Sequence, residues 1–171
     1  MIRRATNTDV EQIMSIVADA QLSLRELGID QWQDGYPSVD VIEDDIASEV
    51  GYVYCVDNRA IGYAAIVLDG EVAYSQIPDS EWNTSNDYVV VHRLCVKRGY
   101  TRSGVAVAMM DFAAQRAREK GYIGFRIDTH RGNIRMLAML EKLGFKYCGI
   151  IHYDSGERLA FDLKLCDSLK M

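Results

Sequence analysis

Short segments rich in Val, Ile and Tyr alternate along the chain with segments whose apolar residues recur at helical spacing. This order restricts the fold more than any other feature of the sequence. We expect strands over residues 2–5, 52–57, 61–68, 88–97, 123–128, 145–152 and 157–165. We expect a first helix that is capped by Thr6, Asn7 or Thr8 and ends at Gly28. Three further helices are expected over 39–49, 104–119 and 133–143. The order β-α-α-β-β-β-α-β-α-β-β predicts one domain over residues 1–171 with a mixed α/β, or α+β, sheet.

The composition is that of an ordinary globular domain. The chain has 171 residues, of which 49% are hydrophobic and 26% charged, enough to bury a core without covalent or metal cross-links. Its formal net charge is −6. Because domains that bind duplex nucleic acid have the opposite balance, we predict no nucleic-acid partner.

The sequence carries no signal for export or membrane insertion. No apolar run approaches the roughly 18 residues of a membrane helix, and no apolar segment follows the early arginines. The cysteines are widely spaced and form no CxxC pair, so we expect reduced thiols, the first three of them buried, and no metal site. These residues are Cys55, Cys95, Cys148 and Cys166. We therefore predict a cytoplasmic protein with no membrane partner.

The stretch from Tyr88 to Met110 contains no Asp or Glu, although the chain is acidic overall. It contains four basic residues, Arg93, Lys97, Arg98 and Arg102. The sequence therefore predicts a local cluster of positive charge at the end of a strand.

This stretch continues into the turn Arg102-Ser103-Gly104-Val105-Ala106, where a helix is expected to begin. Small residues at a strand-to-helix turn allow several backbone N–H groups to face one anion, and the helix N-terminus adds partial positive charge. The alternative is a charged turn whose glycine serves packing alone. The glycine spacings of a P-loop and of a dinucleotide-binding fingerprint are both absent.

A second polar segment, Asp128-Thr129-His130-Arg131-Gly132-Asn133, follows the strand over 123–128 and precedes a helix. Polar residues at the end of a buried strand are where sheet proteins place ligands. Asn133 taken alone is better explained as the cap of the helix that follows it.

Together these two segments resemble the GNAT superfamily of N-acetyltransferases, whose element order this chain follows over nearly its whole length. The resemblance rests on Arg93-Leu94-Cys95-Val96 running into the turn, and on Asn133 with Leu140-Glu141-Lys142-Leu143-Gly144-Phe145. The family's acetyl-CoA motif, Q/R-x-x-G-x-G/A, falls on residues 101–106. Its glycine and final small residue match, whereas Thr101 stands where the family has Gln or Arg.

The resemblance implies a central mixed, mostly antiparallel sheet with splayed fourth and fifth strands, flanked by about four helices. It implies acetyl-CoA as co-substrate, with its pantetheine arm along a bulged strand over 88–97 and a backbone N–H near Val96 polarising the thioester. The residues implied in cofactor binding are Leu94, Cys95, Val96, Arg102, Ser103, Gly104, Val105, Ala106 and Asn133.

The family's direct transfer to an amine implies no acyl-enzyme, so we interpret Cys95 as a core residue and not as a nucleophile. The amine must lose a proton before it attacks. Family members often use a strand glutamate for this step, but this strand has none, and His92 is our candidate base. The alternative is that His92 points away from the site and serves structure only.

The leaving thiolate also needs a proton. Many relatives place a tyrosine where this chain has Leu140, so the usual general acid is missing. Tyr153 is our candidate, with Tyr147 or water as alternatives. We interpret His130 as a loop residue and His152 as a candidate contact of the acceptor.

The resemblance places the acceptor pocket near the loop between the first two helices. This loop carries Trp32, Tyr36, Asp30 and Asp34, which suit a cationic amine but equally fit a loop packed over the core. The acidic insertion over 69–87 either steers a basic acceptor or is a solvated loop. The acceptor is thus predicted only as a primary amine of a small molecule or peptide.

Two other functions remain open at this point. The missing glutamate and tyrosine favour a non-catalytic acyl-CoA-binding or sensing module. The second is an oligomeric interaction protein, a homodimer in which the strand over 157–165 pairs between chains, since relatives often dimerise through such edges.

Overall fold

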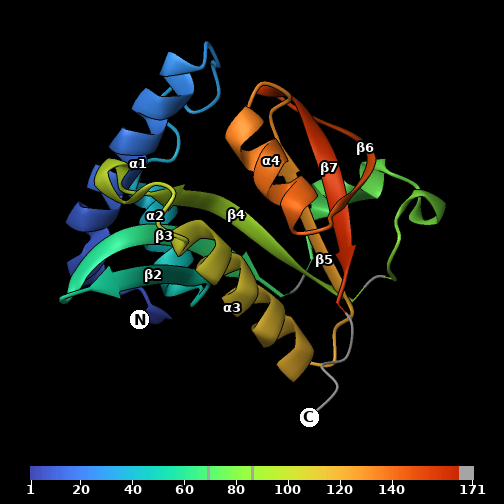
Figure 1. The fold of residues 1–171 in the computed structure, drawn as a ribbon, viewed down its shortest axis with the longest axis horizontal. Helices are drawn as coiled ribbons and strands as arrows, with labels where there is room; N and C mark the ends of the chain where they lie inside the picture. The colour runs from blue at the N-terminus through green and yellow to red at the C-terminus, as the bar shows by residue number, and fades with distance from the viewer. Residues whose placement is uncertain (69, 86, 166–171) are drawn as a thin grey trace. The chain divides into compact units, whose positions relative to one another are not determined.

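The computed structural model describes residues 1–68, 70–85 and 87–165 (Figure 1). The chain divides into two compact units, each built from two chain segments. Unit 1 comprises Met1–Ile66 and Val91–Phe112, and unit 2 comprises Val67–Val90 and Ala113–Met171. Cys166 lies outside the described residues.

The described residues form a mixed α/β fold with four α-helices and a seven-stranded sheet, which confirms the expected fold class. The helices are α1 (Val10–Glu26), α2 (Val39–Ala47), α3 (Val105–Glu119) and α4 (Ile134–Lys142). The strands are β1 (Ile2–Arg4), β2 (Gly51–Val56), β3 (Arg59–Val67), β4 (Tyr88–Val96), β5 (Gly124–Thr129), β6 (Lys146–Tyr153) and β7 (Gly156–Lys164). The short 3-10 helices are η1 (Asn7–Asp9), η2 (Val72–Gln76), η3 (Asp79–Glu81) and η4 (Arg98–Tyr100).

The sheet has the strand order β1-β2-β3-β4-β5-β7-β6. Its ladders are mostly antiparallel, and the parallel pair joins Tyr88–Val90 of β4 to Gly124–Arg126 of β5. The splay expected between these two strands stays a prediction.

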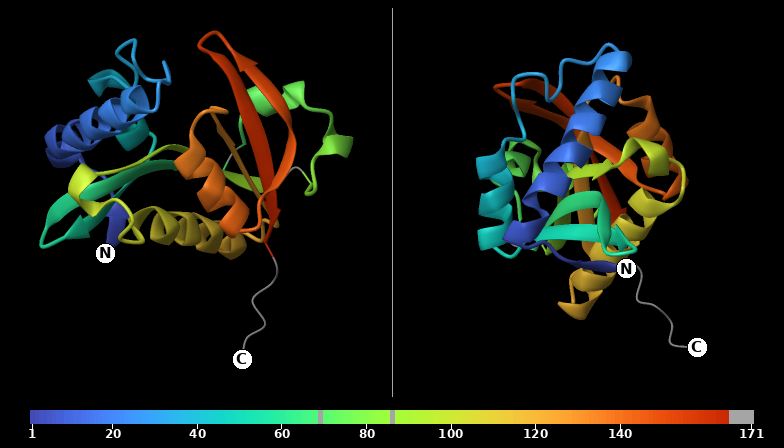
Figure 2. Two further views of the ribbon diagram at one scale, coloured as in Figure 1. Left: turned by 45° about the horizontal axis from the view of Figure 1, so that its top comes forward. Right: turned by 90° about the vertical axis from the view of Figure 1, so that its left-hand side faces the viewer.

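In unit 1, α1 and α2 lie on the same side of β1, β2 and β3 (Figure 2). Their apolar residues meet the inward side chains of β2 and β3, with Ile13, Ile42 and Val53 fully buried. The start of α1 differs from the expectation, because Thr6 begins the 3-10 turn η1 and the α-helix begins only at Val10. The Asp9 carboxylate accepts hydrogen bonds from the Thr6 N–H and hydroxyl and thereby holds this turn.

In unit 2, β7 lies between β5 and β6 and pairs with both along its length. Both hydrogen-bonding edges of β7 are therefore used within one chain. The expectation that the strand over 157–165 pairs between two copies is wrong for this reason.

The insertion after β3 is part of the core of unit 2 and not a solvated loop. Tyr74 and Trp82 are almost fully buried and pack with Tyr88, while η2 lies against β6. The Arg126 guanidinium lies 4.1 Å from the Trp82 ring centre and 4.0 Å from that of Tyr88. These stacked rings and the buried cation anchor the insertion.

The three described cysteines, Cys55, Cys95 and Cys148, are buried and unpaired, as expected. Within the described residues, no helix combines the length and the apolar character needed to cross a bilayer.

Gly62 sets how closely α3 approaches β3 in unit 1. A Cβ at this position would lie 2.7 Å from Val105 Cγ1 and 3.3 Å from Tyr54 Cβ. We therefore expect Gly62→Ala to destabilise the protein by about 1–3 kcal/mol, measured by urea unfolding. Gly99→Ala is the matched control, because a Cβ at Gly99 meets nothing within 4 Å. Equal midpoints for the two variants would contradict this account of the packing.

Candidate functional site

The acid-free stretch is not a free cluster of positive charge, because acids from distant segments of unit 1 pair with its cations. Arg93 binds Asp45, and Arg98 binds Glu26 at 2.8 Å. Lys97 lies 3.7 Å from Asp19. Arg102 makes no hydrogen bond or ion pair with any other residue of the described chain. The predicted basic cluster is thus reduced to Arg102.

Within β4, Arg93 has a left-handed backbone conformation, with φ 55°. Its guanidinium forms a two-point ion pair with Asp45 of α2, through Nε–Oδ2 at 2.8 Å and through Nη2–Oδ1. Tyr63 of β3 donates its hydroxyl to the same carboxylate at 2.6 Å. Arg93 Nη1 also donates to the Tyr36 hydroxyl at 2.8 Å. We call these contacts the Asp45 network. They fix the side chain of the one residue of β4 that departs from extended backbone, in a strand for which the resemblance implies a bulge.

The sequence contains one local indication that the Asp45 carboxylate is buried. Ile42, Asp45 and Ile46 stand at helical i, i+3, i+4 spacing, which places the carboxylate on the apolar face of α2. A buried acid on such a face needs a partner.

The turn from η4 to α3 is shaped by two left-handed residues, Arg102 at φ 65° and Gly104 at φ 86°. The Ser103 N–H and hydroxyl both donate to the Tyr100 carbonyl, so Ser103 closes the turn. The first backbone bond of α3 runs from the Ala108 N–H to the Gly104 carbonyl at 2.9 Å. The N–H groups of the preceding helical turn have no intrahelical acceptor.

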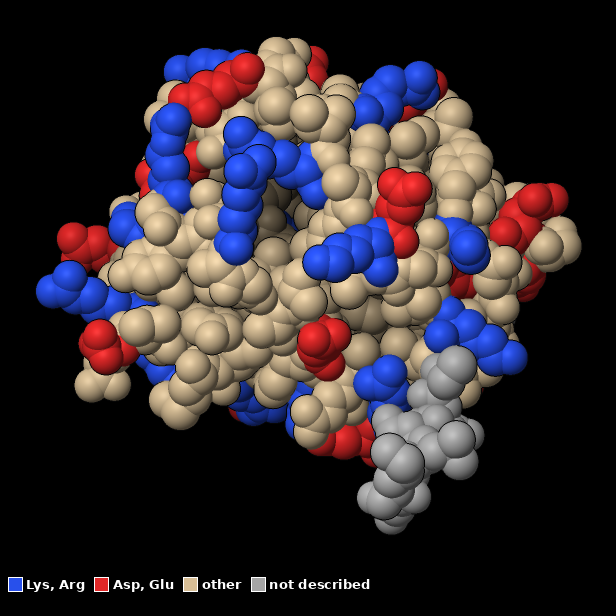
Figure 3. Space-filling view, in the orientation of Figure 1, with Lys and Arg blue, Asp and Glu red and all other residues tan. Residues whose placement is uncertain are grey.

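The turn is open on the side of Gly104, because a Cβ there would meet no heavy atom within 4 Å. Lys and Arg side chains lie over η4 and the turn that follows it (Figure 3). Unpaired N–H groups, the N-terminal end of the α3 dipole and Arg102 together form a site suited to a phosphate or diphosphate group.

In unit 2, the segment after β5 is organised by local hydrogen bonds. Asn133 Oδ1 accepts the Met136 N–H at 3.3 Å, which confirms Asn133 as the cap of α4. Its amide nitrogen donates to no group of the described chain and is left for another acceptor. His130 Nδ1 accepts the Gly132 N–H at 3.0 Å, as a loop residue would.

Tyr153 and Tyr74 both donate their hydroxyls to Asp128 Oδ2 at the end of β5, at 3.1 and 2.9 Å. Burial and then the charge of Asp128 raise the pKa of both tyrosines above its usual value. The sequence offered no local sign of this cluster, because its members come from η2, β5 and β6. Tyr153 is thus engaged with a carboxylate.

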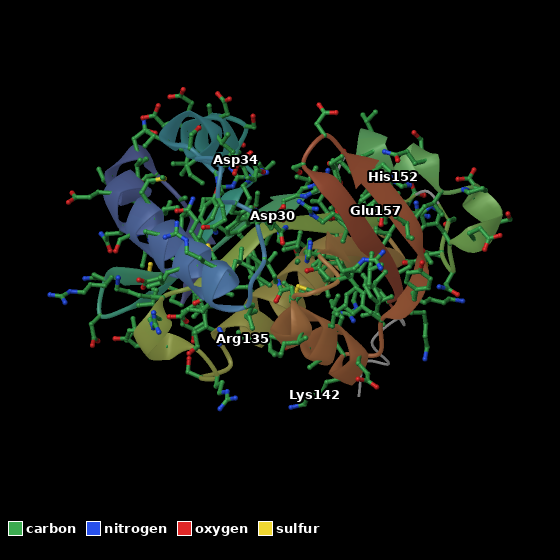
Figure 4. The ribbon with its side chains drawn as sticks, turned by 90° about the horizontal axis from the view of Figure 1, so that it is seen from above. Asp30, Asp34, Arg135, Lys142, His152 and Glu157 are labelled. Carbon is green, nitrogen blue, oxygen red and sulfur yellow. The ribbon has the colours of Figure 1, made fainter. Side chains whose placement is uncertain are left out.

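The other candidate residues separate into different environments. His92 is half-buried on β4. Burial raises the pKa of the Cys95 thiol to about 12, so the thiolate is scarce at neutral pH. Leu140, at the family's tyrosine position, is fully buried. His152 is exposed on β6 beside Glu157 of β7 (Figure 4).

The loop between α1 and α2 carries Asp30 and Asp34 (Figure 4). Trp32 packs against the core of unit 1, and its ring meets that of Tyr36 edge to face at 6.4 Å. Packing over the core therefore accounts for Trp32, while Tyr36 remains 38% exposed.

The model of the GNAT acetyltransferase family matches residues 17–145. This chain belongs to the GNAT acetyltransferase family. A GNAT family acetyltransferase from Streptococcus agalactiae is 32% identical, with a TM-score of 0.84 over 98% of this chain and 96% of the other. Among proteins with curated descriptions, none matches the sequence significantly.

More distant GNAT structures share the fold. The PaiA N-acetyltransferase from Thermoplasma acidophilum, solved in complex with coenzyme A, is 18% identical, with a TM-score of 0.70 over 96% of this chain and 98% of the other. The ribosomal-protein-S18-alanine N-acetyltransferase from Escherichia coli is 14% identical, with a TM-score of 0.68 over 100% and 97% of the two chains. GNAT proteins use acetyl-CoA as co-substrate.

The turn can be tested by placing a negative charge at Gly104. We expect Gly104→Asp to weaken acetyl-CoA binding at least tenfold in calorimetry, because its carboxylate would repel the diphosphate. Gly104→Ala is the control, since it imposes the same left-handed strain without charge. Equal losses in both variants would assign the effect to strain and not to charge, and wild-type affinity in Gly104→Asp would mean that the diphosphate binds elsewhere.

Proposed function

We propose that this protein is an acetyl-CoA-dependent N-acetyltransferase that acetylates a primary amine of a small molecule or peptide. The observation that supports the proposal is the turn from η4 to α3, which is open at Gly104 and whose first-turn N–H groups and Arg102 side chain have no partner among the described residues. A diphosphate bound there places the rest of acetyl-CoA beside the segment of β4 that leads into the turn.

The remaining cofactor contacts follow from this placement. Backbone groups of Leu94 and Val96 bind the pantetheine arm, with Cys95 between them as a core residue. Asn133 is also proposed as a cofactor contact through its amide nitrogen, since its oxygen already caps α4. Ser103 contributes by holding the turn and not through its own N–H.

Acetyl transfer proceeds by attack of the neutral amine on the thioester carbon. The C–N bond forms, the C–S bond breaks, and the amine proton leaves. For an alkylammonium of pKa about 10.4, deprotonation at pH 7 costs about 4.6 kcal/mol, so a proton acceptor accelerates the step. His92 on β4 is the proposed acceptor, acting directly or through one water.

Tyr153 is a weaker candidate for protonating the thiolate than the sequence suggested. Its raised pKa keeps the hydroxyl protonated but also makes it a poor acid toward a thiolate, whose conjugate thiol has a pKa near 8.5. We therefore leave thiolate protonation to water and keep Tyr153 as the weaker candidate acid.

Binding without catalysis is the second candidate function. It is favoured by the buried Leu140 at the position where relatives have a tyrosine, and by the absence of Asp and Glu from β4. The two functions are separated by one pair of measurements on the wild-type protein. Acetyl-CoA should raise the melting temperature, and CoA should be released with amines from a broad panel. Stabilisation without release would favour the binding module, and no stabilisation at millimolar acetyl-CoA would exclude both.

His92→Gln tests the proposed base, because glutamine can still form hydrogen bonds but takes up no proton near neutrality. We expect the turnover number to fall at least tenfold and the affinity for acetyl-CoA to stay within twofold. The fall should be smaller at pH 9, where more of the amine is already neutral. Turnover equal to that of the wild type would remove His92 from the mechanism.

Tyr153→Phe tests the candidate acid. We expect the turnover number to change by less than threefold, because the proposed mechanism leaves protonation of the thiolate to water. A tenfold loss of turnover number with an unchanged KM would instead identify Tyr153 as the general acid.

A further inference from the structure

Tyr36 is held in one position by contacts along its whole length. Its carbonyl accepts from Gln21 Nε2 at 3.0 Å, and its N–H donates to Asp34 Oδ1 at 3.3 Å. Its ring lies edge to face with Trp32, which packs on the core of unit 1. The phenol is thus fixed in direction although it is 38% exposed.

The Tyr36 hydroxyl can still donate a hydrogen bond. A guanidinium only donates hydrogen bonds, so the contact with Arg93 Nη1 at 2.8 Å uses the Tyr36 oxygen as an acceptor. The hydroxyl donates to no group in the part of the chain that the structure describes. Its O–H is therefore directed to a molecule outside the chain.

The Asp45 network makes this donor rigid. The Arg93 and Asp45 side chains are only 15% and 8% exposed, and Asp45 is held from a second side by Tyr63. Because these groups are already ordered and desolvated, a ligand that binds the Tyr36 hydroxyl does not have to order them.

The position of this donor relates it to the proposed reaction. The Tyr36 hydroxyl bonds to the side chain of Arg93, which immediately precedes Leu94, and residues 94–96 are the proposed pantetheine-binding segment. The partner of this O–H must be an oxygen or similar acceptor atom. A second ammonium group would be repelled by the adjacent guanidinium and would offer no lone pair.

We propose that Tyr36 selects the acceptor by donating its hydroxyl proton to a carbonyl or carboxylate oxygen of the acceptor molecule. The substrate class is then an amine that also carries such an oxygen, as in amino acids, their amides and peptide N-termini. Simple alkylamines and polyamines lack this oxygen. The proposal rests on the function proposed above and adds the recognition element of the acceptor.

The test compares amines that differ only in this oxygen-bearing group. Alaninamide supplies a carbonyl, alanine supplies a carboxylate, and isopropylamine has a methyl group in its place. If none is acetylated, the same replacement by methyl is made in whichever amine the wild-type protein does acetylate. We expect the wild-type kcat/KM to favour an oxygen-bearing acceptor over its methyl analogue at least tenfold.

The decisive variant is Tyr36→Phe, which removes only the hydroxyl. We expect the preference for the oxygen-bearing amine to fall at least fivefold, with the KM for acetyl-CoA unchanged. The differing basicities of the amines cancel, because the same pair is compared in both proteins. Tyr122→Phe is the control for loss of a tyrosine hydroxyl elsewhere. Arg93→Lys should also lower the preference, since lysine lacks the planar guanidinium that binds the Tyr36 hydroxyl and Asp45 together.

The outcomes separate this inference from the proposed function. No acetylation of any amine by the wild-type protein would overturn both. Acetylation with equal or greater preference for the methyl analogue would overturn the Tyr36 proposal alone. So would a preference that is unchanged in Tyr36→Phe, and a parallel loss of turnover on every amine would assign Tyr36 a structural role instead.

Discussion

The carboxylate of Asp45 is the interaction on which unit 1 depends most. It is almost inaccessible to solvent, and it accepts hydrogen bonds from Arg93 of β4 and Tyr63 of β3. Removing one partner of such a pair leaves an uncompensated buried charge, at a cost of about 3–5 kcal/mol. The same carboxylate binds the side chain of Arg93, which has a left-handed backbone, so α2 is tied to β4 just before the turn that we propose to bind the cofactor.

The groups proposed to hold acetyl-CoA are mostly backbone groups, and this explains why few side chains mark the site. N–H groups at the start of α3 and backbone groups of residues 94–96 depend on conformation and not on residue identity. The residues required there are those that permit the conformation, above all Gly104 at φ 86°. Thr101 stands where the family has Gln or Arg, and Arg102 makes no ion pair with the described residues.

The proton chemistry is where this chain departs furthest from its family. The family's glutamate is absent from β4, and its tyrosine is replaced by Leu140, which is fully buried. Polar groups remain at two other places, His92 on β4 and the pair of tyrosines that donate to Asp128. An enzyme that leaves thiolate protonation to water needs a well-oriented amine, and the rigid hydroxyl of Tyr36 is suited to that task.

The sequence by itself determined most of the elements, the cap at Asn133 and the family, and it located the turn that we propose as the anion site. Each of these depends on residues within one or a few helical turns or one strand, so local periodicity and spacing were sufficient. Only the tertiary structure decided the pairing of charges and strands. Arg93 and Asp45 are 48 residues apart, and Tyr74 and Asp128 are 54 apart, so no local pattern joins them. Three of the four cations of the acid-free stretch are near acids from other segments, and β7 is an interior strand. Both results depend on which distant segments the folded chain brings together.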